Sequence, residues 1–298
     1  MKEIVVISGK GGTGKTSFTL ALANILSKNH TIVCADCDVD AADMHIVMNP
    51  KTEKTTEFIS GNVAVMHKDL CSRKDGSNCS ICTDVCRFES FHKTPDGFFE
   101  IESGDCEGCM VCVSQCPANA ISFPERRCGE WYVSQTRFGT LVHAALDIRA
   151  ENSGKLVTTV RKEAKKIAQE QNASYIIVDG SPGTGCPVIA SITGCDQVVI
   201  VTEPTVSGIH DLKRVAQLAK HFSIPFAVIV NKASINTEKT NEIHSWCSGN
   251  SIPFLGEVPY NGAVTKAQIE GKTIIEYEED KESRELSSIL QEIAKEIV

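Results

Sequence analysis

The sequence predicts an α/β protein whose mostly parallel sheet is covered by helices on both faces and is interrupted by a small cysteine-rich domain. Short apolar, β-branched runs alternate with helical segments towards both ends of the chain, as in a buried parallel sheet. The first run leads through a glycine-rich loop into a helix. Residues 69–127 break this pattern, because they lack long apolar runs and contain eight of the 14 cysteines.

Each expected strand is an apolar run that ends at a polar side chain. We expect strands at 4–7, 31–35, 175–178, 197–201 and 226–230. Segments 156–170 and 211–221 have helical character. From Leu286 to the end of the chain, apolar residues share one helical face, and acidic residues outnumber basic ones elsewhere. This charge pattern favours packing on the sheet over binding to a membrane surface.

The cysteine-rich segment repeats itself. Residues 79–86 are followed by a strand-like run at 98–101, and residues 106–116 are followed by another at 121–123. We therefore expect residues 69–127 to form a small two-fold α+β domain. It would be inserted into a larger domain made of residues 1–68 and 128–298.

The composition limits the classes of function. The 298 residues carry a net charge of -8 and are 42% apolar, which indicates a globular protein and argues against nucleic acid as the partner. The apolar run near the N-terminus is too short for a signal peptide or a membrane span. We therefore expect a cytoplasmic protein without a membrane partner, whose cysteines are thiols or metal ligands rather than disulfides.

The glycine-rich loop carries a phosphate-binding motif. Residues 9–16 read GKGGTGKT and match G-x-x-x-x-G-K-[ST] between a strand and a helix. In such a loop, backbone N–H groups surround phosphate oxygens while Lys15 supplies charge and Thr16 binds Mg²⁺. The alternative, a chance glycine turn, does not explain this context. The expected nucleotide contacts in the loop are Gly11, Gly12, Thr13, Gly14, Lys15, Thr16 and Ser17.

The second half of the cysteine-rich segment has the spacing of a bacterial ferredoxin. It reads C-x2-C-x2-C-x3-C-P from Cys106 through Cys109 and Cys112 to Cys116. In that run, three thiolates hold one [4Fe-4S] cluster and the fourth reaches a second cluster. Zinc is the competing metal, but zinc sites generally use two separated pairs of ligands.

The first half departs from this spacing. Cys79, Cys82 and Cys86 supply three positions, but Gly76 stands where the first cysteine is expected. Cys71 lies five residues earlier and could serve through a longer loop. The clusters would then be held by Cys71, Cys79, Cys82 and Cys116, and by Cys86, Cys106, Cys109 and Cys112. Without Cys71, the first site has three thiolates and could hold a [3Fe-4S] cluster.

The other six cysteines are expected to be small buried residues. Among them, Cys186 follows Asp179 at an offset similar to that of a cluster-ligating cysteine in the nitrogenase iron protein. The sequence contains no clear second bridging cysteine, so packing remains the preferred role of Cys186.

Together these motifs resemble the MinD/ParA superfamily of P-loop ATPases, in the form that carries an inserted ferredoxin domain. Lys10 resembles the signature lysine of the deviant Walker A motif, KGGxxK[ST], which implies contact with the nucleotide of a partner subunit. Asp36 and Asp38 resemble the first switch, where Asp36 holds Mg²⁺ through water and Asp38 orients the attacking water. Asp179 to Gly183 resemble the Walker B motif and second switch, with the Gly183 N–H placed to sense the γ-phosphate. The resemblance further implies adenine contacts from Asn231 and Pro259.

The resemblance implies an ATPase that uses Mg-ATP and two [4Fe-4S] clusters. Two protomers, identical or paralogous, would enclose the nucleotides. Hydrolysis would control electron transfer to a partner protein or the assembly of a metallocluster on it. The alternatives are a cluster carrier or scaffold with ATP-controlled release, and a positioning ATPase without redox chemistry.

Overall fold

The computed structural model describes residues 1–150, 154–277 and 279–298. The chain forms two compact units, one of residues 1–56, 131–145 and 152–298, and one of residues 57–130 and 146–151. The second unit extends beyond the expected insert at 69–127, because long strands that the sequence analysis did not identify lead into and out of it.

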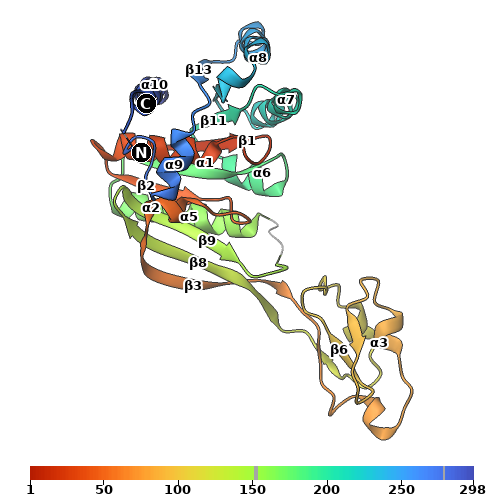
Figure 1. Cartoon of the computed structure of the whole chain (residues 1–298). Coiled ribbons are helices and arrows are strands. Elements are labelled where there is room, and N and C mark those ends of the chain that lie inside the picture. The colour runs from red at the N-terminus through yellow and green to blue at the C-terminus, as the bar shows by residue number, and fades with distance from the viewer. Residues whose placement is uncertain (151–153, 278) are drawn as a thin grey trace. The chain divides into compact units, whose positions relative to one another are not determined.

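The first unit is built on a nine-stranded sheet with the order β13-β12-β11-β1-β10-β2-β9-β8-β3 (Figure 1). Pairing is parallel from β13 through to β9. The turn between β8 and β9 has two residues, so these strands run antiparallel. The strands are β1 (Lys2–Ser8), β2 (Ile32–Asp36), β3 (Lys51–Asn62), β8 (Glu125–Thr136), β9 (Gly139–Leu146), β10 (Tyr175–Pro182), β11 (Gln197–Thr202), β12 (Phe226–Asn231) and β13 (Phe254–Val258).

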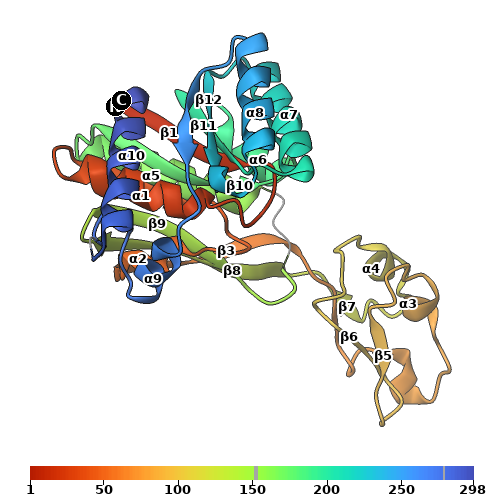
Figure 2. The same cartoon turned by 45° about the horizontal axis from the view of Figure 1, so that its top comes forward.

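Helices cover both faces of this sheet, which confirms the predicted α/β class. One face carries α1 (Lys15–Ser27), α2 (Met44–Met48), α9 (Ala263–Ile269) and α10 (Lys281–Ile297). Right-handed crossovers place α5 (Lys155–Glu170), α6 (Cys186–Ile192), α7 (Val206–His221) and α8 (Thr237–Gly249) on the other face. A short 3-10 helix, η2 (Ala233–Ile235), precedes α8. Figure 2 shows α7 and α8 side by side.

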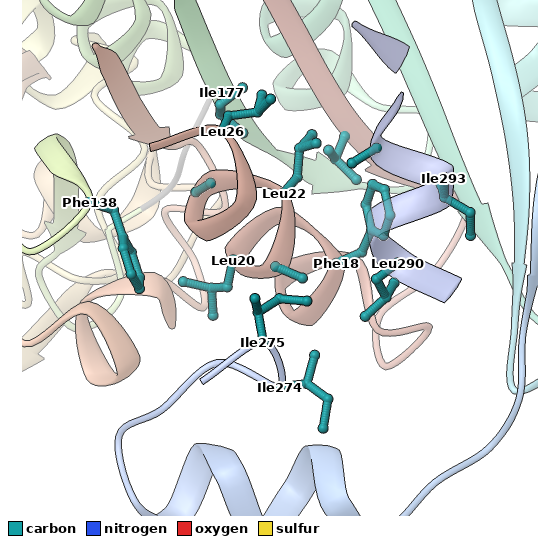
Figure 3. Close-up of a cluster of buried hydrophobic side chains, with 14 of the residues drawn as sticks. Phe18, Leu20, Leu22, Leu26, Phe138, Ile177, Ile274, Ile275, Leu290 and Ile293 are labelled. Atoms are coloured by element: carbon teal, nitrogen blue, oxygen red, sulfur yellow. The ribbon is translucent and has the colours of Figure 1, made fainter. Parts of the chain in front are cut away.

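The C-terminal helix α10 packs in the same buried core as α1 (Figure 3). Ile4 and Val6 of β1 point into this cluster, together with Phe18 of α1 and Leu290 and Ile293 of α10. The alternate residues of β1 point to the opposite face of the sheet and are buried there as well. Residues 4–7 therefore form a continuous apolar run. The predicted packing of the C-terminal helix on the sheet layer is therefore confirmed.

Two helices begin earlier than the sequence analysis expected, because side chains cap their first turns. Thr205 accepts a hydrogen bond from the Gly208 N–H, so α7 begins at Val206 rather than near residue 211. Asp280 and Ser283 form a capping box, so α10 begins at Lys281. Within residues 1–150, 154–277 and 279–298, no helix combines the length and the apolar character needed to cross a membrane.

The second unit has two short antiparallel strand pairs and two short helices. β4 (Val65–Met66) pairs antiparallel with β7 (Ile121–Ser122), and β5 (Phe91–Lys93) pairs antiparallel with β6 (Phe99–Ile101). Each half contributes one helix, α3 (Ile81–Asp84) or α4 (Val111–Gln115), and these two helices contact each other. A short 3-10 helix, η1 (Ser72–Asp75), precedes α3.

Candidate functional site

The glycine-rich loop joins the end of β1 to the start of α1. Gly12 and Gly14 have φ angles of 77° and 90°, which glycine adopts without strain. No atom lies within 4 Å of the point where a side chain would begin on Gly11 or Gly12, so this part of the loop is open. From the other side, Asn231 Nδ2 donates a hydrogen bond to the Thr13 carbonyl oxygen at 2.7 Å. An open glycine loop at the N-terminus of a long helix is the arrangement that binds phosphate.

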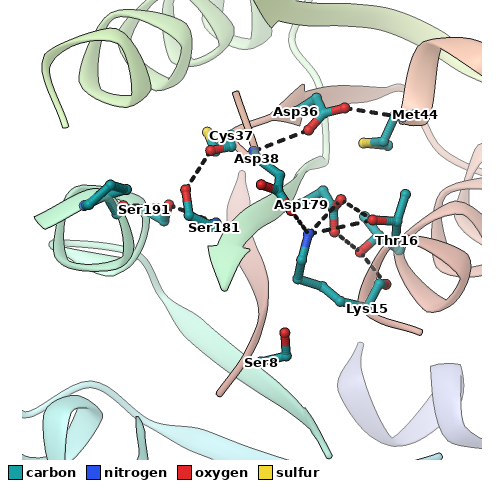
Figure 4. Close-up of polar contacts among 12 residues, drawn as sticks. Ser8, Lys15, Thr16, Asp36, Cys37, Asp38, Met44, Asp179, Ser181 and Ser191 are labelled. Carbon is teal, nitrogen blue, oxygen red and sulfur yellow. Dashed lines mark hydrogen bonds and ion pairs between the residues drawn. The ribbon is translucent and has the colours of Figure 1, made fainter. Parts of the chain in front are cut away.

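Lys15 lies at the start of α1 and contacts carboxylates of β10 and of the segment that follows the neighbouring strand β2 (Figure 4). Its Nζ is 2.8 Å from Asp179 Oδ2 and 3.3 Å from Asp38 Oδ2. Asp179 also accepts hydrogen bonds from Thr16 Oγ1 at 2.6 Å and Thr19 Oγ1 at 2.8 Å. The structure thus brings together the predicted phosphate-binding lysine, the predicted Mg²⁺ ligand and both aspartate segments.

The carboxylates at this edge outnumber the cations. Asp36 is completely buried and accepts backbone hydrogen bonds from Met44 and Asp38. Burial, followed by the nearby Asp179 carboxylate, raises the pKa of Asp36 to about 8 despite the opposing charge of Lys15. Burial also raises the pKa of Asp38, again against Lys15. A site in which three carboxyl groups share one ammonium group, beside a hydroxyl ligand, suits a divalent cation such as Mg²⁺.

Lys15 itself remains a cation in this environment. Burial alone lowers the pKa of its ammonium group, but the carboxylates of Asp179 and Asp38 outweigh that effect and raise the pKa. The positive charge that the motif requires for phosphate binding is therefore maintained in a buried position.

A pocket of about 190 Å³ lies beside the loop. Both residues expected near adenine, Asn231 and Pro259, line it, and other residues of the lining include Gly12, Tyr260, Val264 and Gln268. The Thr13 hydroxyl is buried, and among the described residues it has no hydrogen-bond partner. A mainly apolar pocket next to an open phosphate loop, with a buried hydroxyl left to satisfy, fits a nucleotide.

Hydrogen bonds join the segment of Asp36 and Asp38 to the segment of Asp179. The Cys37 N–H donates to the Asp179 carbonyl oxygen at 2.8 Å, and Ser181 Oγ donates to the Cys37 carbonyl oxygen at 2.6 Å. Gly183 differs from the expectation, because its N–H donates to the Ser8 carbonyl oxygen at 2.9 Å. In this structure the Gly183 N–H is therefore not free to contact a phosphate, since β10 continues to Pro182 beside β1.

Lys10 contacts a residue that sequence reasoning missed. Its Nζ lies 2.6 Å from Glu203 Oε1 and donates to Ser207 Oγ at 3.0 Å. Glu203 also pairs with Lys232 at 3.1 Å, and Lys232 donates to the Gly12 carbonyl oxygen at 2.8 Å. Glu203 directly follows β11, so its place one residue beyond a buried parallel strand was the available signal.

The second unit gathers four cysteines around one small pocket. Cys71, Cys79, Cys82 and Cys116 all line it, together with Arg73 and Phe99. Burial, with smaller effects from the neighbouring Cys79 and Cys71 thiols, raises the pKa of Cys82 to about 11. The structure therefore places Cys71 beside the other three cysteines of this predicted set.

The other four predicted ligands, Cys86, Cys106, Cys109 and Cys112, lie in the same unit, and we call them the second group. Burial raises the pKa of the Cys112 thiol, and Cys106, Cys109 and Cys86 lie close enough to add to the shift. Among the described residues, no three His, Cys, Asp or Glu side chains have the geometry to hold a single metal ion. A cubane cluster makes a different demand, because its four ligands bind four different iron atoms and need not meet at one point.

The six cysteines outside these two groups were expected to be buried, and all but one of them are. Cys34, Cys37, Cys128, Cys195 and Cys247 are buried. Cys186 is exposed at the start of α6. The packing role preferred for Cys186 therefore does not fit its position.

Comparison with known proteins places this geometry in a family. Residues 4–274 match the CobQ/CobB/MinD/ParA nucleotide binding domain. Uncharacterized protein MJ0578 of Methanocaldococcus jannaschii is 34% identical over 257 residues, which cover 86% of each chain. The fold is similar to that of the septum site-determining protein MinD from Pyrococcus horikoshii, solved with Mg-ADP. That match has a TM-score of 0.59 and 16% identity, and it covers 99% of this chain and 95% of MinD.

A shorter match concerns another class of protein. A ferredoxin from Methanothermococcus thermolithotrophicus is 38% identical over 50 residues, which are 17% of this chain and 83% of the ferredoxin. The match to the nucleotide-binding domain, by contrast, spans most of the sequence. The chain therefore belongs to the CobQ/CobB/MinD/ParA nucleotide-binding family.

Proposed function

We propose that this protein is an iron-sulfur ATPase in which Mg-ATP binding and hydrolysis control electron transfer to a partner protein. The observation that carries the proposal is that Cys71, Cys79, Cys82 and Cys116 line one pocket, in a unit that also contains Cys86, Cys106, Cys109 and Cys112. The same chain contains an open phosphate loop with the residues for nucleotide and Mg²⁺. One polypeptide therefore combines an ATPase site with two candidate redox centres.

In the nucleotide site, Lys15 would neutralise phosphate charge and Thr16 would bind Mg²⁺. Asp38 is near enough to Lys15 to lie beside the terminal phosphate, where its role would be to orient water. Asn231, Pro259 and Tyr260 line the pocket that would take the base. The Mg-ADP in the similar MinD structure supports the choice of nucleotide.

In the cysteine unit, each group of four would hold one [4Fe-4S] cluster, which supplies one-electron transfer when bound. The first group is Cys71, Cys79, Cys82 and Cys116, and the second is Cys86, Cys106, Cys109 and Cys112. The ferredoxin match and the two βαβ-like halves support an inserted ferredoxin-like domain. We take residues 69–127 as its ligand-bearing part, flanked by β3 and β8.

Chain connectivity offers a route for coupling between the nucleotide and the cysteine unit. The segment from Asp36 to Asp40 is bonded to the Asp179 segment, and it leads through α2 directly into β3. β3 begins in the first unit and ends in the second. A change of nucleotide that moves Asp36 to Asp40 would therefore act on the strand that enters the cysteine unit.

An anaerobic redox titration followed by EPR, with Mg-ATP, Mg-ADP or Mg²⁺ alone, tests this function. We expect the potential or the line shape of at least one cluster to differ between Mg-ATP and Mg²⁺ alone. Two low-potential signals that ignore nucleotide, with unchanged partner affinity, would contradict electron gating. They would support a cluster carrier if ATP also controls transfer of a cluster to an apo-acceptor. A protein reconstituted anaerobically that binds no iron would contradict any iron-sulfur function.

A further inference from the structure

The first cysteine group contains an irregularity in its chain path. Seven residues, 72–78, separate Cys71 from Cys79, whereas Cys106 and Cys109 are separated by two. A longer loop has a higher entropic cost of closure, so Cys71 needs something to hold it in place. The structure folds this insertion into η1, whose end is closed by Gly76 with a φ angle of 84°.

Arg73, inside the insertion, ties it to two other segments of the unit. Its Nε donates to the Gly97 carbonyl oxygen at 2.7 Å, and its Nη1 donates to the Cys79 carbonyl oxygen at 2.5 Å. The guanidinium group also lies over the Phe99 ring, 4.8 Å from its centroid. Arg73 therefore joins the insertion to the next cysteine and to the turn between β5 and β6.

These contacts are made at the wall of the pocket that Cys71 lines. Arg73 and Phe99 both line that pocket with Cys71 and Cys79. Arg73 is half-buried, whereas the next residue, Lys74, is exposed and is not part of the lining. The backbone N–H of Lys74 donates to the Cys71 carbonyl oxygen at 3.1 Å, so η1 starts directly on Cys71.

We propose that Arg73 is a positioning residue that holds Cys71 as the fourth thiolate of the first cluster site. The proposal rests on the proposed function, because it assumes that the two cysteine groups hold clusters. A guanidinium group suits this role, since its planar fork donates in two directions while its face stacks on an aromatic ring. A lysine at this position would keep the charge but could not make all three contacts.

Anaerobic reconstitution of the full-length protein, followed by iron analysis and EPR, tests this role. The wild-type protein should contain about eight iron atoms per chain, four for each cluster. We expect Arg73→Gln to behave like Cys71→Ser: a three-iron EPR signal appears in the oxidised protein, and the second cluster keeps its spectrum. Arg73→Lys should recover part of the four-iron signal at most. Lys74→Gln, which removes the same charge from the same helix, should match the wild type.

The outcomes separate this inference from the proposed function. A wild-type protein without iron would contradict the proposed function and leave Arg73 no cluster to support. If the wild type and Cys71→Ser behave as expected but Arg73→Gln retains two four-iron clusters, the role of Arg73 is wrong. Loss of both clusters in Arg73→Gln would also overturn it, because general unfolding of the unit would then explain the result. Equal effects of Arg73→Gln and Lys74→Gln would show that charge, not position, is what matters.

Discussion

Lys15 occupies a position where phosphate binding and folding depend on the same charge. The side chain is 6% exposed and lies between Asp179 and Asp38, near the buried Asp36. We expect Lys15→Met to abolish ATP binding, measured by isothermal titration calorimetry. It should also lower the free energy of unfolding at pH 7 by about 3 kcal/mol, because buried carboxylates lose their cation.

Lys10→Met provides the matched control for this prediction. Lys10 carries the same charge in the same loop, but its side chain is 33% exposed. Its replacement should change the urea midpoint little, because a partly exposed ion pair contributes about 1 kcal/mol or less. Equal stability of the Lys15→Met variant and the wild type would show that the carboxylates do not depend on Lys15.

His143 is a buried histidine that should make the first unit sensitive to acid. Its Nε2 lies 3.1 Å from Ser134 Oγ, and its ring stacks on His45 and Tyr132. Burial, together with His45, lowers the pKa of His143 to about 4.

Because the pKa of His143 is lower in the folded than in the unfolded state, stability is lost as the pH falls through about 6.5 towards 4. The loss from this residue should reach about 2 kcal/mol at pH 5. We expect His143→Phe to lose less unfolding free energy between pH 7 and pH 5 than the wild type, as measured in urea. His210→Gln, at a histidine that is 71% exposed, should follow the wild type. The prediction fails if the His143→Phe and wild-type curves are parallel.

Helix α10 buries one face against α1. Leu290 is 4% exposed and packs in the same cluster as Phe18 of α1. We expect Leu290→Ala to destabilise the first unit by about 2 to 5 kcal/mol, because it leaves a cavity against α1. Glu285→Ala, on the exposed side of α10, should change the unfolding free energy by less than about 0.5 kcal/mol. A thermal or urea unfolding series on the two variants measures the difference.

The strands show which elements a sequence can reveal. β1, β10 and β11 are buried on both faces, so each contains an unbroken apolar run of at least three residues. β3 was not predicted, because its sequence KTEKTTEFISGN is polar and mostly exposed in the structure. A strand of this kind is specified by its pairing with β8, and that partner lies far away in the sequence.

The candidate site shows the same division. Lys15, Thr16 and Asp179 could be predicted, because a local motif places the first two and Asp179 directly follows an apolar run. The contact of Glu203 with Lys10 could not, since it depends on how β11 lies beside β1. The contacts of Arg73 could not be predicted either, because its partners at Gly97 and Cys79 come together only when the second unit folds.

At the scale of the whole molecule, the chain forms two units, and extended strands connect one unit to the other. The sequence analysis located the cysteines of the second unit, because their spacing is local. It did not locate the limits of that unit, because β3 and β8 each belong partly to both units. Composition therefore locates the cysteine-rich part of the second unit, whereas the packing of the strands determines where that unit begins and ends.

The family resemblance implies that Lys10 contacts the nucleotide of a second copy. In the structure Glu203 holds Lys10 within its own chain at 2.6 Å, and the pKa of Glu203 is lowered by the two lysines against the effect of burial. Dimerisation would require Lys10 to leave Glu203 in both protomers, at a cost of about 1 kcal/mol each. The two protomers together give about 2 kcal/mol, so we expect Glu203→Gln to tighten the Mg-ATP-dependent dimer by up to about thirtyfold.

Sedimentation velocity over a range of protein concentrations, with Mg-ATP or Mg-ADP, measures this equilibrium. Wild-type protein should dimerise only with Mg-ATP, and Lys10→Met should remain monomeric even though it still binds ATP. Glu203→Gln should dimerise at lower protein concentration than the wild type. A weaker dimer in Glu203→Gln would mean that Glu203 supports the interface instead of restraining Lys10. A Lys10→Met protein that dimerises normally would contradict a role for this lysine across the interface.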